Sequence, residues 1–106
     1  MAMFTLTTAS FEEQVIQAAN PVLVEFTAPW CGYCRRLAPV LDRMKDEAGM
    51  PDIGTIDIDQ EPALAERYHI DTIPTLLLFR NGVPGAALVA PGTAAQIKSW
   101  LAAQEV

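Results

Sequence analysis

Two cysteines, Cys31 and Cys34, are the only ones in the 106-residue chain, and they form a single Cys-x-x-Cys motif. They follow an apolar run at residues 22–27 that is typical of a strand buried on both faces, and a segment with helical spacing begins at the motif. The first N–H groups of a helix lack intrahelical partners and carry partial positive charge, which favours a thiolate at Cys31. Cys34 lies one turn later on the same helix face, at a spacing that suits a disulfide. A nucleophilic, reversible thiol pair is the chemistry that this placement predicts.

Two other roles are open to this pair. As a structural cross-link it closes so short a loop that the gain is about 2 kcal/mol, at the low end for disulfides. As a zinc site it needs four ligands, and the chain offers one histidine, His69, beside the two cysteines, so a carboxylate has to complete the set. Redox exchange is favoured because Cys-x-x-Cys beside a strand–helix–strand pattern is typical of it. We therefore expect no metal and no organic cofactor, and we expect His69 at the surface.

Glu25 is the one charged residue in the apolar run that precedes the cysteines. A carboxylate inside a strand that is apolar on both sides is costly unless it is protonated or paired, and burial raises its pKa. The residues alone leave two interpretations open. Either Glu25 lies at a solvated strand end, or it is a buried acid.

The elements that must position these residues alternate between strands and helices. Such an order, with parallel strands first and an antiparallel hairpin at the Asn81-Gly82 turn signal, predicts an α/β three-layer sandwich around a central mixed sheet. We expect residues 1–106 to form one domain. The expected strands are Met3–Leu6, Val22–Thr27, Ile53–Ile58, Thr75–Phe79 and Ala86–Val89, and the expected helices run from Phe11 to about Asn20, from Cys31 to Ala48, from Pro62 to Tyr68 and from Thr93 onward.

Local signals mark the ends of these helices. Ser10 with Glu13, and Thr93 with Gln96, have the spacing of capping boxes, in which two residues satisfy each other's free backbone donors. Gly49 is expected just past the long helix that starts at the cysteines, because glycine tolerates the left-handed conformation that ends many helices.

Composition excludes several classes of protein. The formal net charge is −6, with 51% apolar and 19% charged residues, which is too apolar for a disordered chain and too acidic for a nucleic-acid binder. The sequence contains no apolar stretch of the roughly 18 residues that a membrane span needs. The start of the chain lacks the basic flank of a signal peptide, so we expect a cytoplasmic protein with no membrane or nucleic-acid partner.

The motif also carries a resemblance. The segment LVEFTAPWCGYC at residues 23–34, followed by LAP at 37–39, resembles the active-site segment of the thioredoxin superfamily. The segment IPT at residues 73–75, with NG at 81–82, is similar to the second signature of that family. The matches follow the family's order along nearly the whole chain, and the flank around the cysteines is similar to the catalytic domains of protein disulfide isomerases. The resemblance implies a thioredoxin-like fold and a thiol–disulfide oxidoreductase that reduces client proteins.

The resemblance further implies roles for individual residues. Cys31 is the attacking thiolate, Cys34 the resolving thiol, and Glu25 a buried acid that relays a proton to and from Cys34. Pro74 follows a cis peptide bond and faces the cysteines, and cis bonds are largely confined to proline. The implied docking residues for a client are Trp30, Gly32, Tyr33, Thr72, Ile73 and Pro74.

Three positions depart from the family pattern. Thr55 stands where the family commonly has a lysine on the neighbouring strand that faces the acid, so we expect the pKa of Glu25 to rise further. Tyr33 replaces a proline, and we expect its backbone N–H to donate toward the Cys31 sulfur and to make the protein more oxidising. The loop Ala90-Pro91-Gly92 stands where the family usually has its glycine two positions earlier.

The resemblance implies two kinds of partner, disulfide-containing client proteins and an electron donor of the thioredoxin-reductase type. We expect the protein to be a monomer. Two alternatives stay open: the same chemistry run as a disulfide oxidase or isomerase, and a non-catalytic binding module that uses the thioredoxin fold.

Overall fold

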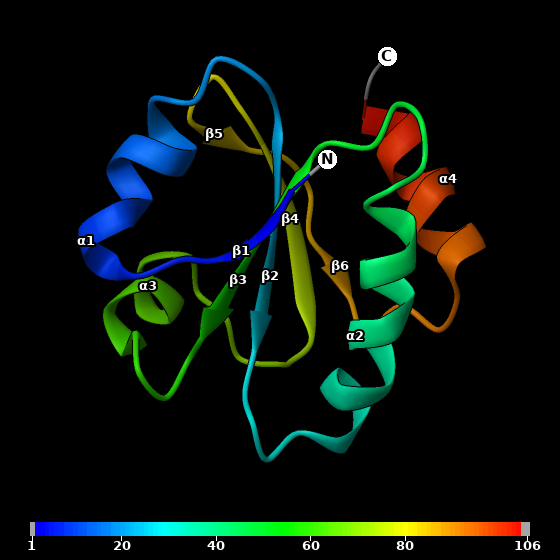
Figure 1. Ribbon diagram of the computed structural model, residues 1–106. Helices are drawn as coiled ribbons and strands as arrows, with labels where there is room; N and C mark the ends of the chain where they lie inside the picture. The colour runs from blue at the N-terminus through cyan, green and yellow to red at the C-terminus, as the bar shows by residue number, and fades with distance from the viewer. Residues whose placement is uncertain (1, 105–106) are drawn as a thin grey trace.

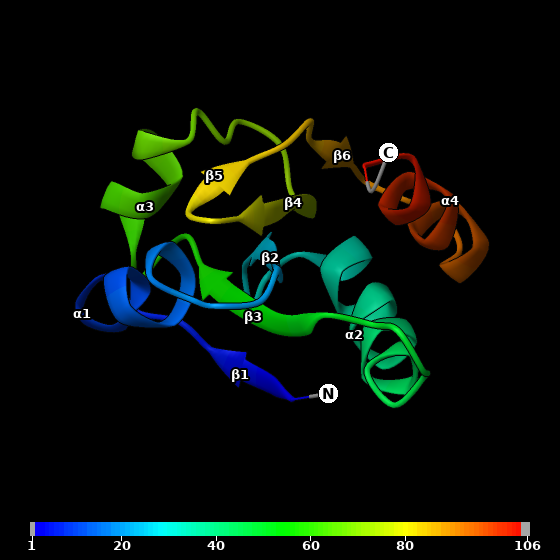
Figure 2. The same cartoon turned by 90° about the horizontal axis from the view of Figure 1, so that it is seen from above.

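A mixed sheet lies between two layers of helices in the computed structural model, which describes residues 2–104 (Figures 1 and 2). In chain order the elements are β1 (Met3–Thr5), α1 (Thr8–Phe11), a π-helical turn η1 (Glu12–Ile16), β2 (Val22–Thr27), α2 (Gly32–Met44), β3 (Asp52–Asp57), α3 (Pro62–Arg67), β4 (Thr75–Arg80), β5 (Val83–Pro84), β6 (Leu88–Val89) and α4 (Ala94–Gln104). Both views show α1 and α3 on one face of the sheet and α2 and α4 on the other. The expected three-layer α/β arrangement is confirmed.

The strand order is β1-β3-β2-β4-β5. β1 and β2 run parallel to β3, whereas β4 runs antiparallel to β2, so the expected mixed sheet is confirmed. The strand expected at Ala86–Val89 is only partly right, because two short strands pair with β4 instead of one. β5 pairs with the end of β4 and β6 with its start. Pro84 in β5 has no N–H to donate, which suits a short edge strand.

The core consists of two apolar clusters, one on each face of the sheet. Alternation along β2 turns Val22, Val24 and Phe26 toward α1 and α3, and turns Leu23 toward α2 and α4. The helices supply the other half of each cluster: Phe11, Val15 and Leu64 on the first face, and Leu37, Leu41, Met44, Ile97 and Leu101 on the second. Burial of β2 on both faces explains its continuous apolar sequence.

The first helix begins earlier than its capping signal suggests. Thr7, not Ser10, is the N-cap: Thr7 Oγ1 accepts the Ser10 N–H at 3.2 Å, and Ser10 Oγ accepts the Thr7 N–H at 3.0 Å. The expected box of Ser10 with Glu13 is therefore wrong. An equivalent box three residues earlier, with a serine as its second member, forms instead. The π-helical turn that follows ends the segment at Ile16, short of Asn20.

The other helix ends agree in part with the sequence signals. α2 ends at Met44, before the expected Ala48, and turn hydrogen bonds such as Glu47 N–H to Met44 O at 3.0 Å follow it. Gly49 has the expected positive φ of 84°, but it lies in this turn and does not end the helix. Within residues 2–104 no helix is long and apolar enough to cross a membrane.

The last helix has half of its expected capping box. Thr93 Oγ1 accepts the Gln96 N–H at 3.1 Å, as a capping residue should. The Gln96 side chain, however, accepts the N–H of Gly92 at 2.8 Å and not that of Thr93. Gln96 thus holds the loop before the helix by a hydrogen bond to Gly92. The helix α4 begins at Ala94.

Gly54, in the middle of β3, leaves no room for a side chain beneath Leu6. A Cβ added at Gly54 would overlap Leu6 Cδ1 and lie 2.9 Å from Leu6 Cγ. We predict that Gly54→Ala lowers the free energy of unfolding by about 1–3 kcal/mol, as overpacking does in other cores. Urea unfolding followed by far-UV circular dichroism measures this loss.

A double-mutant cycle with Leu6→Ala identifies the cause of that loss. Leu6 is buried, so Leu6→Ala alone also destabilises the protein, but it removes the atoms that the new Cβ meets. The double variant should lose less stability than the sum of the two single losses. Strictly additive losses would show that Leu6 is not what excludes a side chain at position 54.

Candidate functional site

Cys31 and Cys34 lie where β2 gives way to α2, and they are joined in a disulfide with a Cα–Cα distance of 5.2 Å. Cys31 is the N-cap of α2, with extended backbone angles, and its Sγ accepts the Cys34 N–H at 3.1 Å. The sulfur therefore takes the position that a serine or aspartate oxygen occupies at ordinary helix N-termini. Both cysteines are buried, Cys31 with 8% and Cys34 with 3% of its surface exposed.

The donor to the Cys31 sulfur is not the one expected. Within residues 2–104, the N–H that bonds to Cys31 Sγ belongs to Cys34, and the Tyr33 amide makes no such bond. The prediction concerns the Cys31 thiolate of the reduced form, whereas the structure holds the disulfide, so the effect of Tyr33 on the reduction potential stays a prediction. Tyr33 makes its contacts through its side chain.

Glu25 is buried, with 2% of its surface exposed, so the solvated strand end is excluded. Glu25 lies two residues after Leu23 in β2, so the two side chains share one face of the sheet. That face is covered by α2, the helix that carries Cys34. The neighbours of Glu25 in register are Thr55 on β3 and Leu76 on β4, neither of which carries a charge. Its Oε2 is buried without a hydrogen-bond partner, and burial raises the pKa of Glu25 to about 7.

The segment around Pro74 packs against the cysteines. The Ile73–Pro74 peptide bond is cis, as the resemblance implied. Ile73 is half-buried against the small cluster that Ala28, Cys31 and Cys34 form. Thr75 Oγ1 donates to the carbonyl of Thr72 at 2.5 Å, which holds the turn before the proline. The structure thereby brings the Cys-x-x-Cys motif and the second signature together.

Trp30 and Tyr33 form the exposed aromatic rim of the site. Trp30 is 63% exposed, and its Nε1 donates to Asp59 Oδ2 at 2.7 Å. The Tyr33 hydroxyl lies 2.8 Å from the carbonyl oxygen of Ala90 and 3.0 Å from that of Pro91. Two further residues of the expected docking set are also accessible: Gly32, the first residue of α2, is half-buried, and Thr72 is exposed.

Sequence reasoning missed the residues that these aromatic side chains contact. Asp59 follows β3 without any motif of its own, and the bond to Trp30 spans 29 positions. The loop at Ala90 and Pro91 was singled out only for the position of its glycine, and nothing in the sequence indicated that Tyr33 would reach across 57 positions to it. Contacts of this kind depend on the tertiary fold and leave no local pattern.

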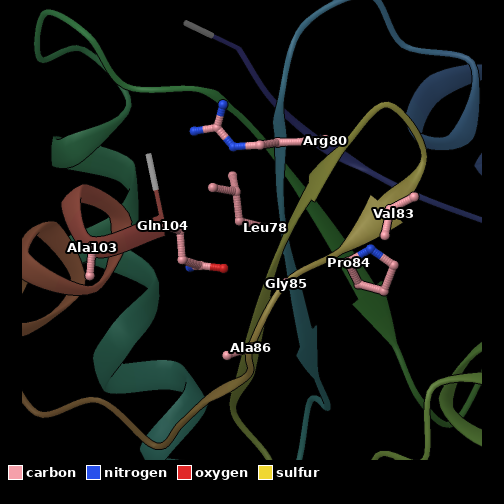
Figure 3. A pocket seen from close by; sticks show the side chains of 8 residues that line it. All are labelled: Leu78, Arg80, Val83, Pro84, Gly85, Ala86, Ala103 and Gln104. Atoms are coloured by element: carbon pink, nitrogen blue, oxygen red, sulfur yellow. The ribbon is translucent and has the colours of Figure 1, made fainter. Parts of the chain in front are cut away.

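Two cavities differ in their relation to the cysteines. One, of about 250 Å³, lies beside Cys34 and Asp57 at the start of α2. Another, of about 390 Å³, lies between β4, the β5 hairpin and the end of α4 (Figure 3). Arg80 and Gln104 line that second cavity, at the end of β4 away from Pro74. Only the first cavity opens beside the disulfide.

A metal centre has no support among the described residues. In residues 2–104 no group of three His, Cys, Asp or Glu side chains comes together in a way that would hold an ion. His69, the histidine considered for a zinc site, is exposed on the turn after α3, as expected of a surface residue.

The fold and the site agree with comparisons to known proteins. The thioredoxin family model matches residues 2–103. A thioredoxin of Alicyclobacillus acidocaldarius subsp. acidocaldarius is 39% identical over 102 residues, covering 95% of this chain and 96% of that protein. Thioredoxins of Streptomyces clavuligerus and Acidithiobacillus ferridurans are 40% and 41% identical, covering 82% and 90% of this chain and 90% and 89% of those proteins, respectively.

The similarity therefore extends along nearly the whole chain and is not confined to the Cys-x-x-Cys motif. The chain belongs to the thioredoxin family, and its activity is that of a thiol–disulfide oxidoreductase.

Proposed function

We propose that this protein reduces disulfides in client proteins, with Cys31 as the attacking thiol and Cys34 as the resolving thiol. The observation that carries the proposal is the position of the pair, with the Cys31 sulfur at the N-cap of α2 and in a bond with Cys34. Partial positive charge at the helix start favours a thiolate at Cys31. The lower exposure of Cys34 suits a thiol that meets only Cys31.

The reaction proceeds through two exchanges. In the first, the Cys31 thiolate attacks one sulfur of a client disulfide, the client S–S bond breaks, and the other client sulfur leaves as a thiolate and takes up a proton. In the second, Cys34 loses its proton and attacks Cys31, so the mixed disulfide breaks and the second client sulfur leaves. Two electrons pass from the cysteine pair to the client. An electron donor of the thioredoxin-reductase type returns the pair to its dithiol form.

Glu25 is the proposed proton acceptor for Cys34. It lies on the face of β2 that packs toward α2, and its pKa of about 7 lets it exchange a proton near neutral pH. The lack of a charged residue at Thr55 and Leu76 supports this, because a cation there would hold Glu25 ionised and weaken it as a base.

The client binds across the proposed docking residues. Trp30 and Tyr33 are exposed beside Cys31, and the turn at Thr72, Ile73 and Pro74 packs next to the same disulfide. We propose that the backbone at Thr72 and Ile73 pairs with the extended chain that carries the client cysteine. Gly32, between Cys31 and Tyr33 in the sequence, is the remaining residue of this proposed surface.

The direction of electron flow completes the proposal. Reduction of clients requires a compartment that keeps thiols reduced, so we propose a cytoplasmic location. We further propose that residues 1–106 act as one monomeric domain. Equilibrium redox titration against glutathione distinguishes a reductase from an oxidase or isomerase, because an oxidase needs a higher reduction potential than glutathione.

Removal of the resolving thiol provides the main test of the two-cysteine mechanism. In Cys34→Ser the first exchange still occurs but the second does not, so mixed disulfides between Cys31 and client proteins should accumulate. Non-reducing electrophoresis, followed by mass spectrometry of the cross-linked peptide, detects them. Cys31→Ser is the matched control and should trap nothing. Normal turnover by Cys34→Ser without any trapped client would contradict the mechanism.

Burial of Glu25 predicts a pH-dependent cost to the folded protein. The pKa of Glu25 is about 7 in the folded protein against 4.5 in the unfolded chain, so the folded state binds the proton more tightly. Stability from this group is present below about pH 4.5 and is lost as the pH rises to about 7. The loss is about 3 kcal/mol. In Glu25→Leu this loss should be absent, which urea unfolding of the oxidised protein across that pH range measures.

Two further measurements distinguish the proposed role of Glu25 in proton transfer from its effect on stability. Glu66→Leu, at an exposed site on α3, is the matched control and should keep the wild-type pH dependence. At neutral pH, Glu25→Leu should resolve the mixed disulfide up to about a hundredfold more slowly, because a general base has been removed. An unchanged rate would show that Glu25 takes no part in proton transfer.

A further inference from the structure

The loop after β6 lies beside Pro74, one of the proposed docking residues. β6 pairs with Thr75 and Leu76, the first residues of β4. The next residue, Ala90, donates its N–H to the carbonyl of Pro74 at 2.8 Å. The loop is therefore anchored at the cis-proline turn, where it forms one side of the region that a client chain would cross.

The Tyr33 side chain joins this loop to the Cys-x-x-Cys motif. Its hydroxyl has a single proton to donate, and it lies within 3.0 Å of two acceptors, the carbonyl oxygens of Ala90 and Pro91. The guanidinium of Arg36 lies 5.3 Å from the centre of the Tyr33 ring, which holds the ring against α2. Tyr33, which lies between the two cysteines in sequence, thus connects the motif to a loop that is remote in sequence.

The backbone of the loop gives an independent reason for such a bridge. Ala90 has a φ of 47°, in the left-handed region that favours glycine. A non-glycine residue is strained in this conformation, so other contacts must hold it in place. The Ala90 N–H bond to Pro74 is one such contact, and the Tyr33 hydroxyl is the other.

We propose that Tyr33 is a positioning residue that holds the Ala90–Pro91 loop as one wall of the proposed client-binding surface and thereby sets a preference for protein disulfides over small ones. The inference rests on the proposed function. A protein client presents an extended chain that has to fit between this wall and the Pro74 turn. A small disulfide needs only the Cys31 sulfur. Release of the loop should therefore weaken the binding of protein clients more than reactivity with small disulfides.

Tyr33→Phe tests the proposal because it removes the hydroxyl and keeps the ring. Steady-state kinetics would be measured with insulin as the protein disulfide and with 5,5′-dithiobis(2-nitrobenzoate) as the small one. Loss of one hydrogen bond corresponds to about a 2- to 10-fold effect. We expect the ratio of kcat/KM for insulin to kcat/KM for the small disulfide to fall by that factor, mainly through a higher KM for insulin.

Tyr68→Phe is the matched control. Tyr68, the other tyrosine of the chain, packs against Phe11 and Phe79 on the opposite face of the sheet. It should leave both assays unchanged, which corrects for any general effect of a lost phenol. Urea unfolding of both variants shows whether a change in stability accompanies a change in the ratio.

The outcomes separate the inference from the function on which it rests. If the wild-type protein reduces neither disulfide, the proposed function is wrong. If it reduces both but Tyr33→Phe leaves the ratio unchanged, or lowers both activities equally, the positioning role is overturned while the reductase stands. A fall in kcat for insulin without a change in KM also overturns it, because the hydroxyl would then act after binding.

Discussion

The bond from the Cys34 amide to the Cys31 sulfur is the interaction on which the rest of the site depends. The bond forms because β2 is held between β3 and β4 and ends at Thr27, a few residues before α2 begins at Gly32. A helix start has unpaired N–H groups, and a sulfur at the N-cap satisfies one of them. The same junction puts Glu25 on the strand before the disulfide and Tyr33 between the two cysteines, in the first turn of α2. The position of the reactive sulfur therefore depends on both the strand before it and the helix that begins after it.

Glu25 shows how function is built into the core at a cost in stability. Glu25 shares its face of β2 with the buried Leu23, and the register of the sheet sets it between Thr55 and Leu76. Without a cation, the carboxyl is most stable when protonated, which is why its pKa lies near 7 and not near 4.5. An apolar residue at this position would give a more stable protein without a buried base. The energetic cost and the proposed proton transfer thus have the same physical origin, desolvation.

The parts of this protein that could be predicted from sequence are those set by local physics. Apolar periodicity located the strands β2 and β4 because burial on both faces leaves a clear pattern. Helix ends were less predictable, since several short polar residues near Thr7 satisfy the same cap and only packing selects among them. The split of the expected last strand into β5 and β6 likewise depends on pairing with β4. The cis bond before Pro74 could be predicted only from the family resemblance, because the peptide bond before a proline is trans in most proteins.

The same division separates the two halves of the site. The reactive half is local: Cys31, Cys34 and the helix start lie within a few residues, so their spacing alone indicates the chemistry. The half that would recognise a client is assembled from three distant segments, the motif, the Pro74 turn and the Ala90 loop, joined by contacts that span up to 58 positions. A substitution at a residue that joins these segments, such as Tyr33, can therefore change the half that would recognise a client and leave the reactive pair intact.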